Sequence, residues 1–241
     1  MPGKCLRALS SAQASLHARG VGKGAMAAAF EGGSTRVPRP YQSTLRAQAA
    51  LATRRKILDS AMRLFLEQGY GKVTVGDIAA AASLALPTVY ASTGGKAAIL
   101  GTLIDEAVKD PIVDQTLSAV RKSKSGNEIL GIVAHGTRVD NERYHDIIEV
   151  LKHAAAVDAN AAAILQQSND EYRRALSHVA RRLRTLKATP AGMTEARITD
   201  VLWFYFGHDP WHSLVADRGW PWDDAEQWLL AQATMALLAR R

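Results

Sequence analysis

Seven residues between Thr74 and Lys96 have the chemistry that contacts with double-stranded DNA require. The hydroxyl groups of the two threonines and the ammonium group of the lysine suit phosphates, which fix register without reading sequence. A tyrosine can contact a base edge or a phosphate, and apolar side chains can contact a thymine methyl group. The predicted DNA-contacting residues are Thr74, Val75, Leu86, Pro87, Thr88, Tyr90 and Lys96.

Two helices are expected to lead into this stretch. Apolar residues recur every three or four positions over residues 45–68, which predicts a helix with one buried face, and Gly69 is a natural C-terminal stop. Thr74 is expected to cap a second helix over residues 75–81, with Asp77 near the capping-box position.

A tight turn and a third short helix follow. The turn is Ala82-Ser83-Leu84, and Pro87 suits the start of a helix because its missing N–H costs little there. Gly94-Gly95 should end that helix, and Lys96 begins a fourth. Two short helices joined by a tight turn are the layout of a helix-turn-helix, which places its second helix in the DNA major groove. Ser83 is expected to need a left-handed backbone in this turn.

The stretch resembles the N-terminal domain of the TetR family of repressors. The residues that carry the resemblance are Phe65, Gly69-Tyr70, Thr74-Val75, Asp77-Ile78-Ala79, Ala82-Ser83-Leu84, Pro87-Thr88-Val89-Tyr90 and Lys96. By this resemblance Leu86, Pro87 and Tyr90 would face base edges. The sequence departs from the family pattern at three positions, where the family usually has glycine, an aromatic residue and glutamate: Ser83, Thr93 and Ala97.

The charge is unevenly distributed along the 241 residues, whose formal net charge is +7. Residues 1–40 hold six Lys or Arg against one acid, residues 41–100 seven against three, and residues 101–241 seventeen against nineteen. A basic N-terminal region, residues 1–100, followed by a near-neutral remainder suits a protein that contacts phosphates at one end. Arg54, Arg55 and Lys56 are read either as a phosphate clamp or as a solvated helix start.

The predicted fold is all-α. Residues 1–40 are rich in glycine and lack periodicity, which predicts a disordered basic tail or, alternatively, an arm that follows the DNA minor groove. Residues 41–100 form the expected three-helix helix-turn-helix domain, and residues 101–241 a helical effector-binding and dimerisation domain. Pro111 is expected to interrupt the helical pattern. Later helices are predicted over residues 127–138, 141–156, 160–187, 195–207 and 223–239.

The C-terminal domain contains the run Trp203-Phe204-Tyr205-Phe206, whose side chains on a helix cannot all face one core. Some are therefore expected at a ligand pocket or a partner subunit, with ordinary core packing as the alternative. The predicted pocket residues are His135, Tyr144, His145, His153, Trp203 and Phe206. The last helix, expected to be capped by Asp223, also resembles the dimerising end of that family. Its predicted interface residues are Leu229, Leu230, Ala233, Leu237 and Leu238.

Several chemistries are not expected. The sequence has no nucleotide-binding glycine loop, no nucleophile elbow and no zinc-protease motif, so we predict neither an enzyme nor a cofactor. His208 and His212 have metal-ligand spacing, but Pro210 lies between them and no third ligand is in view, so no metal site is predicted. The single cysteine, Cys5, excludes an internal disulfide and suits a cytoplasmic protein. No window of the sequence is apolar over a length that could span a membrane, so no membrane partner is expected.

The resulting hypothesis is a ligand-responsive transcriptional repressor that binds palindromic operator DNA as a homodimer. Its expected partners are double-stranded operator DNA, a second copy of the chain and a small apolar effector. The alternative is a small-molecule binding protein whose helix-turn-helix has lost sequence-specific DNA binding. The apolar character of Leu86 and Pro87 and the departure at Thr93 favour this alternative.

Overall fold

The computed structural model describes residues 40–108 and 110–239, with side chains from Leu45 onward except that of Val108. The prediction of a disordered tail over residues 1–40 falls, apart from Pro40, outside the described residues. The chain divides into two compact units, Met1–Gln48 and Ala49–Arg241, and every contact discussed below lies within the second unit.

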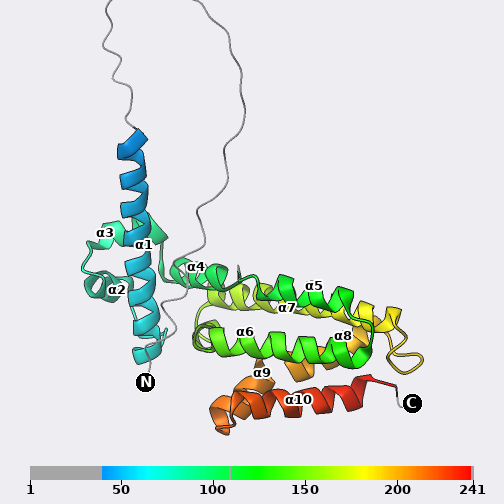
Figure 1. Ribbon diagram of the computed structural model, residues 1–241. Coiled ribbons are helices and arrows are strands. Elements are labelled where there is room, and N and C mark those ends of the chain that lie inside the picture. Colours follow the sequence, from blue (N-terminus) through cyan, green and yellow to red (C-terminus); the bar gives the residue numbers. More distant parts are fainter. Residues whose placement is uncertain (1–39, 109, 240–241) are drawn as a thin grey trace, which may run out of the picture. The chain divides into compact units, whose positions relative to one another are not determined.

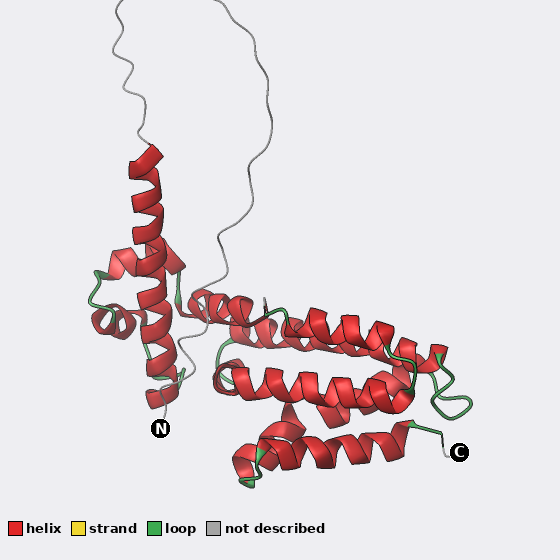
Figure 2. Ribbon diagram, in the orientation of Figure 1, coloured by secondary structure: helices red, strands yellow, loops and turns green. Residues whose placement is uncertain are grey.

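All regular structure in the described residues is helical, as predicted (Figure 2). The helices are α1 (Pro40–Gln68), α2 (Val75–Ala81), α3 (Leu86–Thr93), α4 (Lys96–Val108), α5 (Ile112–Lys122), α6 (Gly126–Ala155), α7 (Ala159–Thr185), α8 (Glu195–Phe206), α9 (His208–Trp211), a π-helical turn (His212–Asp217) and α10 (Trp222–Leu237). No single helix in residues 40–108 and 110–239 is long and apolar enough to cross a membrane; only α2 and α3 together, bent by 105°, meet that test by length and composition.

Side-chain caps explain where several helices begin. Thr74 forms the expected capping box, because its hydroxyl accepts from the Asp77 N–H at 3.1 Å and Asp77 Oδ2 accepts from the Thr74 N–H at 2.9 Å. Ser125 caps α6 by accepting from the N–H of Glu128. Asp158 caps α7, where Oδ1 accepts from two backbone N–H groups. The prediction that Asp223 caps α10 is wrong, because that residue lies inside the first turn and Pro221 occupies the cap position.

The helices differ from the sequence-based expectation in three places, one of which is α9 with the π-helical turn, where no helix was predicted. The helix α5 follows Pro111 directly and was not predicted. The two helices predicted over residues 127–138 and 141–156 are one continuous helix, α6. The helix continues through Asp140 and Asn141, where the Asn141 amide donates to the Thr137 carbonyl at 2.8 Å and the side chain is buried.

The helices after α4 pack around two apolar clusters. In Figure 1, α5, α6 and α7 run alongside one another, and α10 lies along α6, with which it is in contact. One cluster joins the helix-turn-helix to α4 and to the neighbouring ends of α6 and α7, through residues such as Ile57, Ile99 and Leu151. The other lies between α6, α7, α8 and α10, around residues such as Phe206 and Leu229. The first cluster therefore contains residues of both predicted domains.

The turn between α2 and α3 confirms the expectation for Ser83, whose φ is +55°. The N–H groups of Ser83 and Leu84 donate to the carbonyls of Ala80 and Ala79, the Schellman arrangement in which glycine is preferred at this position. A left-handed conformation costs a residue with a Cβ about 1–2 kcal/mol, whereas glycine loses more entropy on folding.

We therefore expect Ser83→Gly to raise the free energy of unfolding by about 0.5–1 kcal/mol in urea titrations. Ala80→Gly is the matched control, because it places glycine inside α2 and should lower the same quantity by about 1 kcal/mol. A Ser83→Gly variant less stable than its parent would show that the left-handed backbone carries no strain.

Candidate DNA-contacting surface and effector cavity

The helix α3 exposes the residues predicted to meet DNA. Leu86 and Tyr90 are four positions apart and therefore on one face, and their side chains are 43% and 53% exposed. Pro87 and Thr88 are also exposed. The opposite face holds the helix in place, because Val89 is fully buried in the cluster that also contains Ile78 of α2. Thr74 is exposed at the start of α2 and Val75 is half-buried beside it.

Two cations fix the ends of α3 and α4. Arg54 of α1 donates to the Ser92 carbonyl at 3.0 Å and to Thr102 Oγ1 at 3.1 Å, so its guanidinium ties α1 to both helices. Arg54 therefore acts neither as a phosphate clamp nor as a solvated residue at a helix start, which were the two interpretations of the basic run at residues 54–56. Lys96 Nζ donates to the Tyr70 carbonyl at 2.9 Å and lies 4.2 Å from the centroid of that ring.

Tyr70 also joins the helix-turn-helix to the start of α7. Its hydroxyl donates to Asp158 Oδ2 at 2.7 Å. Burial raises the pKa of Tyr70 well above its ordinary value, and the Asp158 hydrogen bond and charge add to the shift, so the hydroxyl keeps its proton. Asp158 therefore serves two functions, because one carboxylate oxygen caps α7 while the other accepts from Tyr70.

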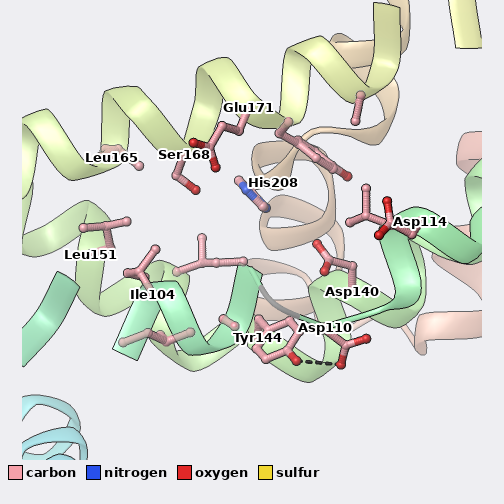
Figure 3. Close-up of a pocket in the computed structure, with 16 residues that line it drawn as sticks. Ile104, Asp110, Asp114, Asp140, Tyr144, Leu151, Leu165, Ser168, Glu171 and His208 are labelled. Carbon is pink, nitrogen blue, oxygen red and sulfur yellow. Dashed lines mark hydrogen bonds between the residues drawn. The ribbon is translucent and has the colours of Figure 1, made fainter. Parts of the chain in front are cut away.

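A cavity of about 210 Å³ lies between α4, α5, α6, α7 and α9 (Figure 3). It exceeds the roughly 150 Å³ of an engineered apolar cavity that admits benzene. Ile104 and Ala107 of α4 line it, and α4 begins directly after the turn that ends α3. Figure 3 shows the apolar side chains Ile104, Leu151 and Leu165 toward one side and Asp110, Asp114 and Asp140 toward the other, whereas Glu171 lies beside Ser168.

Four carboxyl groups line the cavity, and three of them are paired or exposed. Asp110 Oδ2 accepts from the Tyr144 hydroxyl at 2.7 Å and pairs with Arg143. Burial alone would raise the pKa of Asp110, but these partners and the Ile112 N–H together hold that pKa below its ordinary value. Glu171 accepts from Gln167 and lies 3.7 Å from Arg174. Asp114 is exposed.

Asp140 is the fourth carboxyl group, and it has no such partner. Among the described residues, none donates a hydrogen bond to its side chain or forms an ion pair with it within 4.0 Å. Burial raises the pKa of Asp140 to about 6, the charge of Asp110 raises it further, and Arg143 opposes the shift. The group therefore titrates just below neutral pH, which is rare for an aspartate.

His208 faces the same cavity as a neutral ring. Burial lowers the pKa of His208 to about 4, with Lys152 acting in the same direction and Asp209 and Glu149 opposing it. Its Nδ1 lies 2.8 Å from Asn141 Oδ1. Because the Asn141 NH₂ donates to Thr137, the amide oxygen faces the ring, and we assign the proton to Nδ1 and a lone pair to Nε2.

The cavity includes only one of the six predicted pocket residues, Tyr144. Trp203 lies behind the lining, where its ring is 5.5 Å from that of Tyr172. Phe206 is fully buried in the core, and its carbonyl accepts from the Tyr172 hydroxyl. His145 stacks on His212 at 5.7 Å. His135 and His153 are exposed, the former 3.4 Å from Glu226.

The predicted dimer residues of α10 lie mainly against their own chain. Leu229, Ala233 and Leu237 are no more than 1% exposed, so these three cannot form a surface for a partner; Leu230 and Leu238 are half-buried. The helix is rotated about its axis relative to the prediction. The exposed residues Trp228, Ala231 and Met235, at steps of three and four, form what we call the outward stripe of α10. Trp228 and Met235 are 43% and 63% exposed, and Phe204 of α8 is 69% exposed.

Residues 57–103, from the second half of α1 into α4, match the model of a protein family described as bacterial regulatory proteins, tetR family. This match covers the whole helix-turn-helix and the first residues of the helix that leads to the cavity. No curated protein sequence matches the chain.

Solved structures resemble the chain over most of its length. NalD of Pseudomonas aeruginosa, described as the secondary repressor of the MexAB-OprM multidrug efflux pump, aligns with a TM-score of 0.65 at 18% identity, over 80% of this chain and 100% of NalD. A SmeT–triclosan complex aligns at 0.64 and 18%, over 78% and 92%. A putative transcriptional regulator from Saccharomonospora viridis in complex with choline aligns at 0.61 and 17%, over 78% and 98%. At sequence identities of 17–18%, this structural similarity shows that the fold is shared.

Proposed function

We propose that this chain, a member of the tetR family of bacterial regulatory proteins, is a ligand-responsive transcriptional repressor that binds palindromic operator DNA as a homodimer. One observation carries the proposal: the exposed face of α3 and the cavity are connected by a single helix, α4. A ligand that displaces Ile104 or Ala107 therefore acts on the helix that positions α3. The capped start of α2 would supply phosphate contacts, together with Lys96 at the start of α4, whose half-buried side chain donates to the Tyr70 carbonyl.

The relatives of known structure support a small-molecule effector. NalD is described as a repressor, and the structures of two neighbours contain triclosan and choline. These ligands belong to those proteins. For this chain, the cavity of about 210 Å³ supports an effector of similarly small size.

Selection of DNA fragments bound by the purified protein, followed by sequencing, tests the DNA-binding proposal. We expect an inverted repeat whose half-sites are about one helical turn apart or a multiple of it, because a twofold dimer presents α3 twice. Selected fragments with no common sequence would instead support the alternative, a small-molecule binding protein whose helix-turn-helix no longer reads DNA.

The outward stripe of α10 is the proposed dimer surface. A glutamate at position 235 would face its own symmetry copy at a twofold interface, where burial of like charges opposes association. We therefore expect Met235→Glu to raise the dimer dissociation constant at least about tenfold in analytical ultracentrifugation.

Met235→Leu is the matched control and should leave the dissociation constant near that of the parent, because it preserves an apolar side chain of similar size. At concentrations where the parent is monomeric, both variants should unfold at the parental temperature, since Met235 is exposed within one chain. A parental dissociation constant for Met235→Glu would exclude this stripe from the interface.

A further inference from the structure

The cavity lining contains hydrogen-bond acceptors without a protein donor, whereas its two tyrosine hydroxyls already donate to other protein groups. The Tyr144 hydroxyl donates to Asp110, and the Tyr172 hydroxyl donates to the Phe206 carbonyl. The Asp140 carboxylate and, by our assignment, His208 Nε2 accept no hydrogen bond from any residue the structure describes. The Ser168 hydroxyl can act in either sense. A polar ligand that satisfies this lining must therefore bring donors.

The lining also has an excess of negative charge. Four of the sixteen lining residues are carboxylic acids, and none is lysine or arginine. His208 adds no positive charge because burial keeps its ring neutral. Arg143 and Arg174 approach Asp110 and Glu171 from outside the lining, whereas Asp140 has no cation to pair with among residues 40–108 and 110–239. An anionic ligand would bring a second buried negative charge beside Asp140, which is costly.

Three of the four carboxyl groups lie apart from the apolar part of the cavity, and Glu171 lies nearer to it beside Ser168. Figure 3 shows Asp140 near Asp110, Asp114 and Tyr144, with Ile104, Leu151 and Leu165 farther along the cavity. The Tyr172 and His208 rings, which stack at 5.0 Å, add aromatic surface beside the polar part. Aromatic faces attract cations when water is excluded. The arrangement suits a molecule with one charged end and one apolar end.

We propose that this cavity binds a small organic cation whose ammonium group pairs with Asp140 and whose apolar part lies among Ile104, Leu151 and Leu165. The inference rests on the proposed function for its biological meaning, since this ligand would be the effector. It refines the expected small apolar effector by adding a positive charge. The cavity itself is a property of one chain and can be tested without DNA.

Three probes of similar shape distinguish the charge that the cavity prefers. Phenethylamine is a cation, phenethyl alcohol is neutral and phenylacetate is an anion, and each carries one phenyl ring on a short chain. We expect isothermal titration calorimetry with the full chain at pH 8 to show amine binding at least about tenfold tighter than alcohol binding, because a charge-assisted hydrogen bond is worth about 1.5–3 kcal/mol. Phenylacetate should bind most weakly.

Asp140→Asn keeps the shape and removes the charge. It should weaken amine binding at least about tenfold and leave alcohol binding within about threefold of the parent. Asp114→Asn is the matched control, because it removes an exposed carboxylate from the same lining and should change amine binding less than about threefold. Circular dichroism of each variant checks that it is folded.

The pH dependence gives a second readout. The groups that face or surround Asp140 are Asp110, Asp114, Glu171, His208, Arg143, Tyr144 and Tyr172. Because burial raises the pKa of Asp140 to about 6, the parental affinity for the amine should fall about tenfold per pH unit below about 6, as Asp140 takes up a proton. The Asp140→Asn variant should lack this decrease.

Three results would overturn the proposal: equal affinities for the amine and the alcohol, parental amine binding by Asp140→Asn, or no amine binding at millimolar concentration. Mobility-shift assays with a selected operator then test the cation site separately from the proposed repressor function. Amine binding through Asp140 with no effect on the operator complex supports the cation site and contradicts the ligand-responsive repressor. Operator binding without amine binding supports the DNA-binding proposal and contradicts the cation site.

Discussion

Replacement of Tyr90 by alanine is expected to weaken specific operator binding by about 5- to 150-fold, which corresponds to the 1–3 kcal/mol of a good base contact. Tyr90 is the largest exposed side chain of α3, and it shares a face with Leu86. Its ring makes no ring–ring contact with another described residue, so its removal should not disturb the core. The measurement is a mobility-shift titration against the selected operator and against unrelated DNA of equal length.

Binding of the Tyr90→Ala variant to unrelated DNA should stay close to that of the parent, because nonspecific affinity comes from phosphates. Leu66→Ala is the control, since Leu66 is also an exposed apolar residue but lies near the end of α1. The variant should remain dimeric at parental concentration. An unchanged midpoint on the operator would remove Tyr90 from the DNA-contacting surface.

The second large effect is expected from Asp140 in the absence of ligand. Its folded-state pKa is raised from 3.8 to about 6, a difference of about two units, which is worth about 3 kcal/mol. A raised pKa means that the stabilising contribution is fully present below the unfolded pKa and is lost as pH rises through about 6. Above that pH the folded chain holds a half-buried carboxylate that accepts no hydrogen bond from a described residue.

Asp140→Asn should therefore raise the free energy of unfolding at pH 8 by as much as about 3 kcal/mol in urea titrations. The gain should shrink as pH falls from 7 to 5, because the parental carboxyl group then becomes protonated. Asp114→Asn should stay within about 0.5 kcal/mol of the parent throughout, since its side chain is exposed. A loss of stability in Asp140→Asn at pH 8 would contradict an unpaired carboxylate.

The helix-turn-helix could be predicted from sequence because its signals are local. Thr74 and Asp77 form the capping box that their spacing indicates, Gly69 ends α1 with a φ of +83°, and Ser83 adopts the left-handed conformation that the short turn requires. Each of these depends on residues within a few positions of one another, so no knowledge of distant contacts is needed.

The cavity could not be predicted in the same way, because its lining comes from five helices and a loop. Five of the six residues chosen for their aromatic or imidazole side chains lie elsewhere. One local signal was available: positions 133, 137, 140, 144, 147 and 151 form a three-and-four stripe on α6, and this otherwise mostly buried face contains an aspartate. A carboxylate in such a stripe marks a functional position more directly than aromatic content does.

The outward stripe of α10 shows a third limit of sequence reasoning. Both faces of α10 carry apolar residues, and the sequence alone does not tell which face meets the core. The structure assigns Leu229, Ala233 and Leu237 to the core, where they meet α6 and α8, and leaves Trp228 and Met235 outside. A difference of one or two positions turns a helical residue by 100° or more, which moves it from one face to another.

Thermodynamic linkage makes any coupling through α4 reciprocal between the proposed effector site and the proposed DNA-contacting surface. If occupation of the cavity lowers operator affinity by a given factor, operator DNA must lower the affinity of the cavity for its occupant by the same factor. The protein bound to its operator would thus have a lower affinity for the effector than the same protein free in solution. The number of operator copies in a cell would then set part of the effector concentration needed for a response.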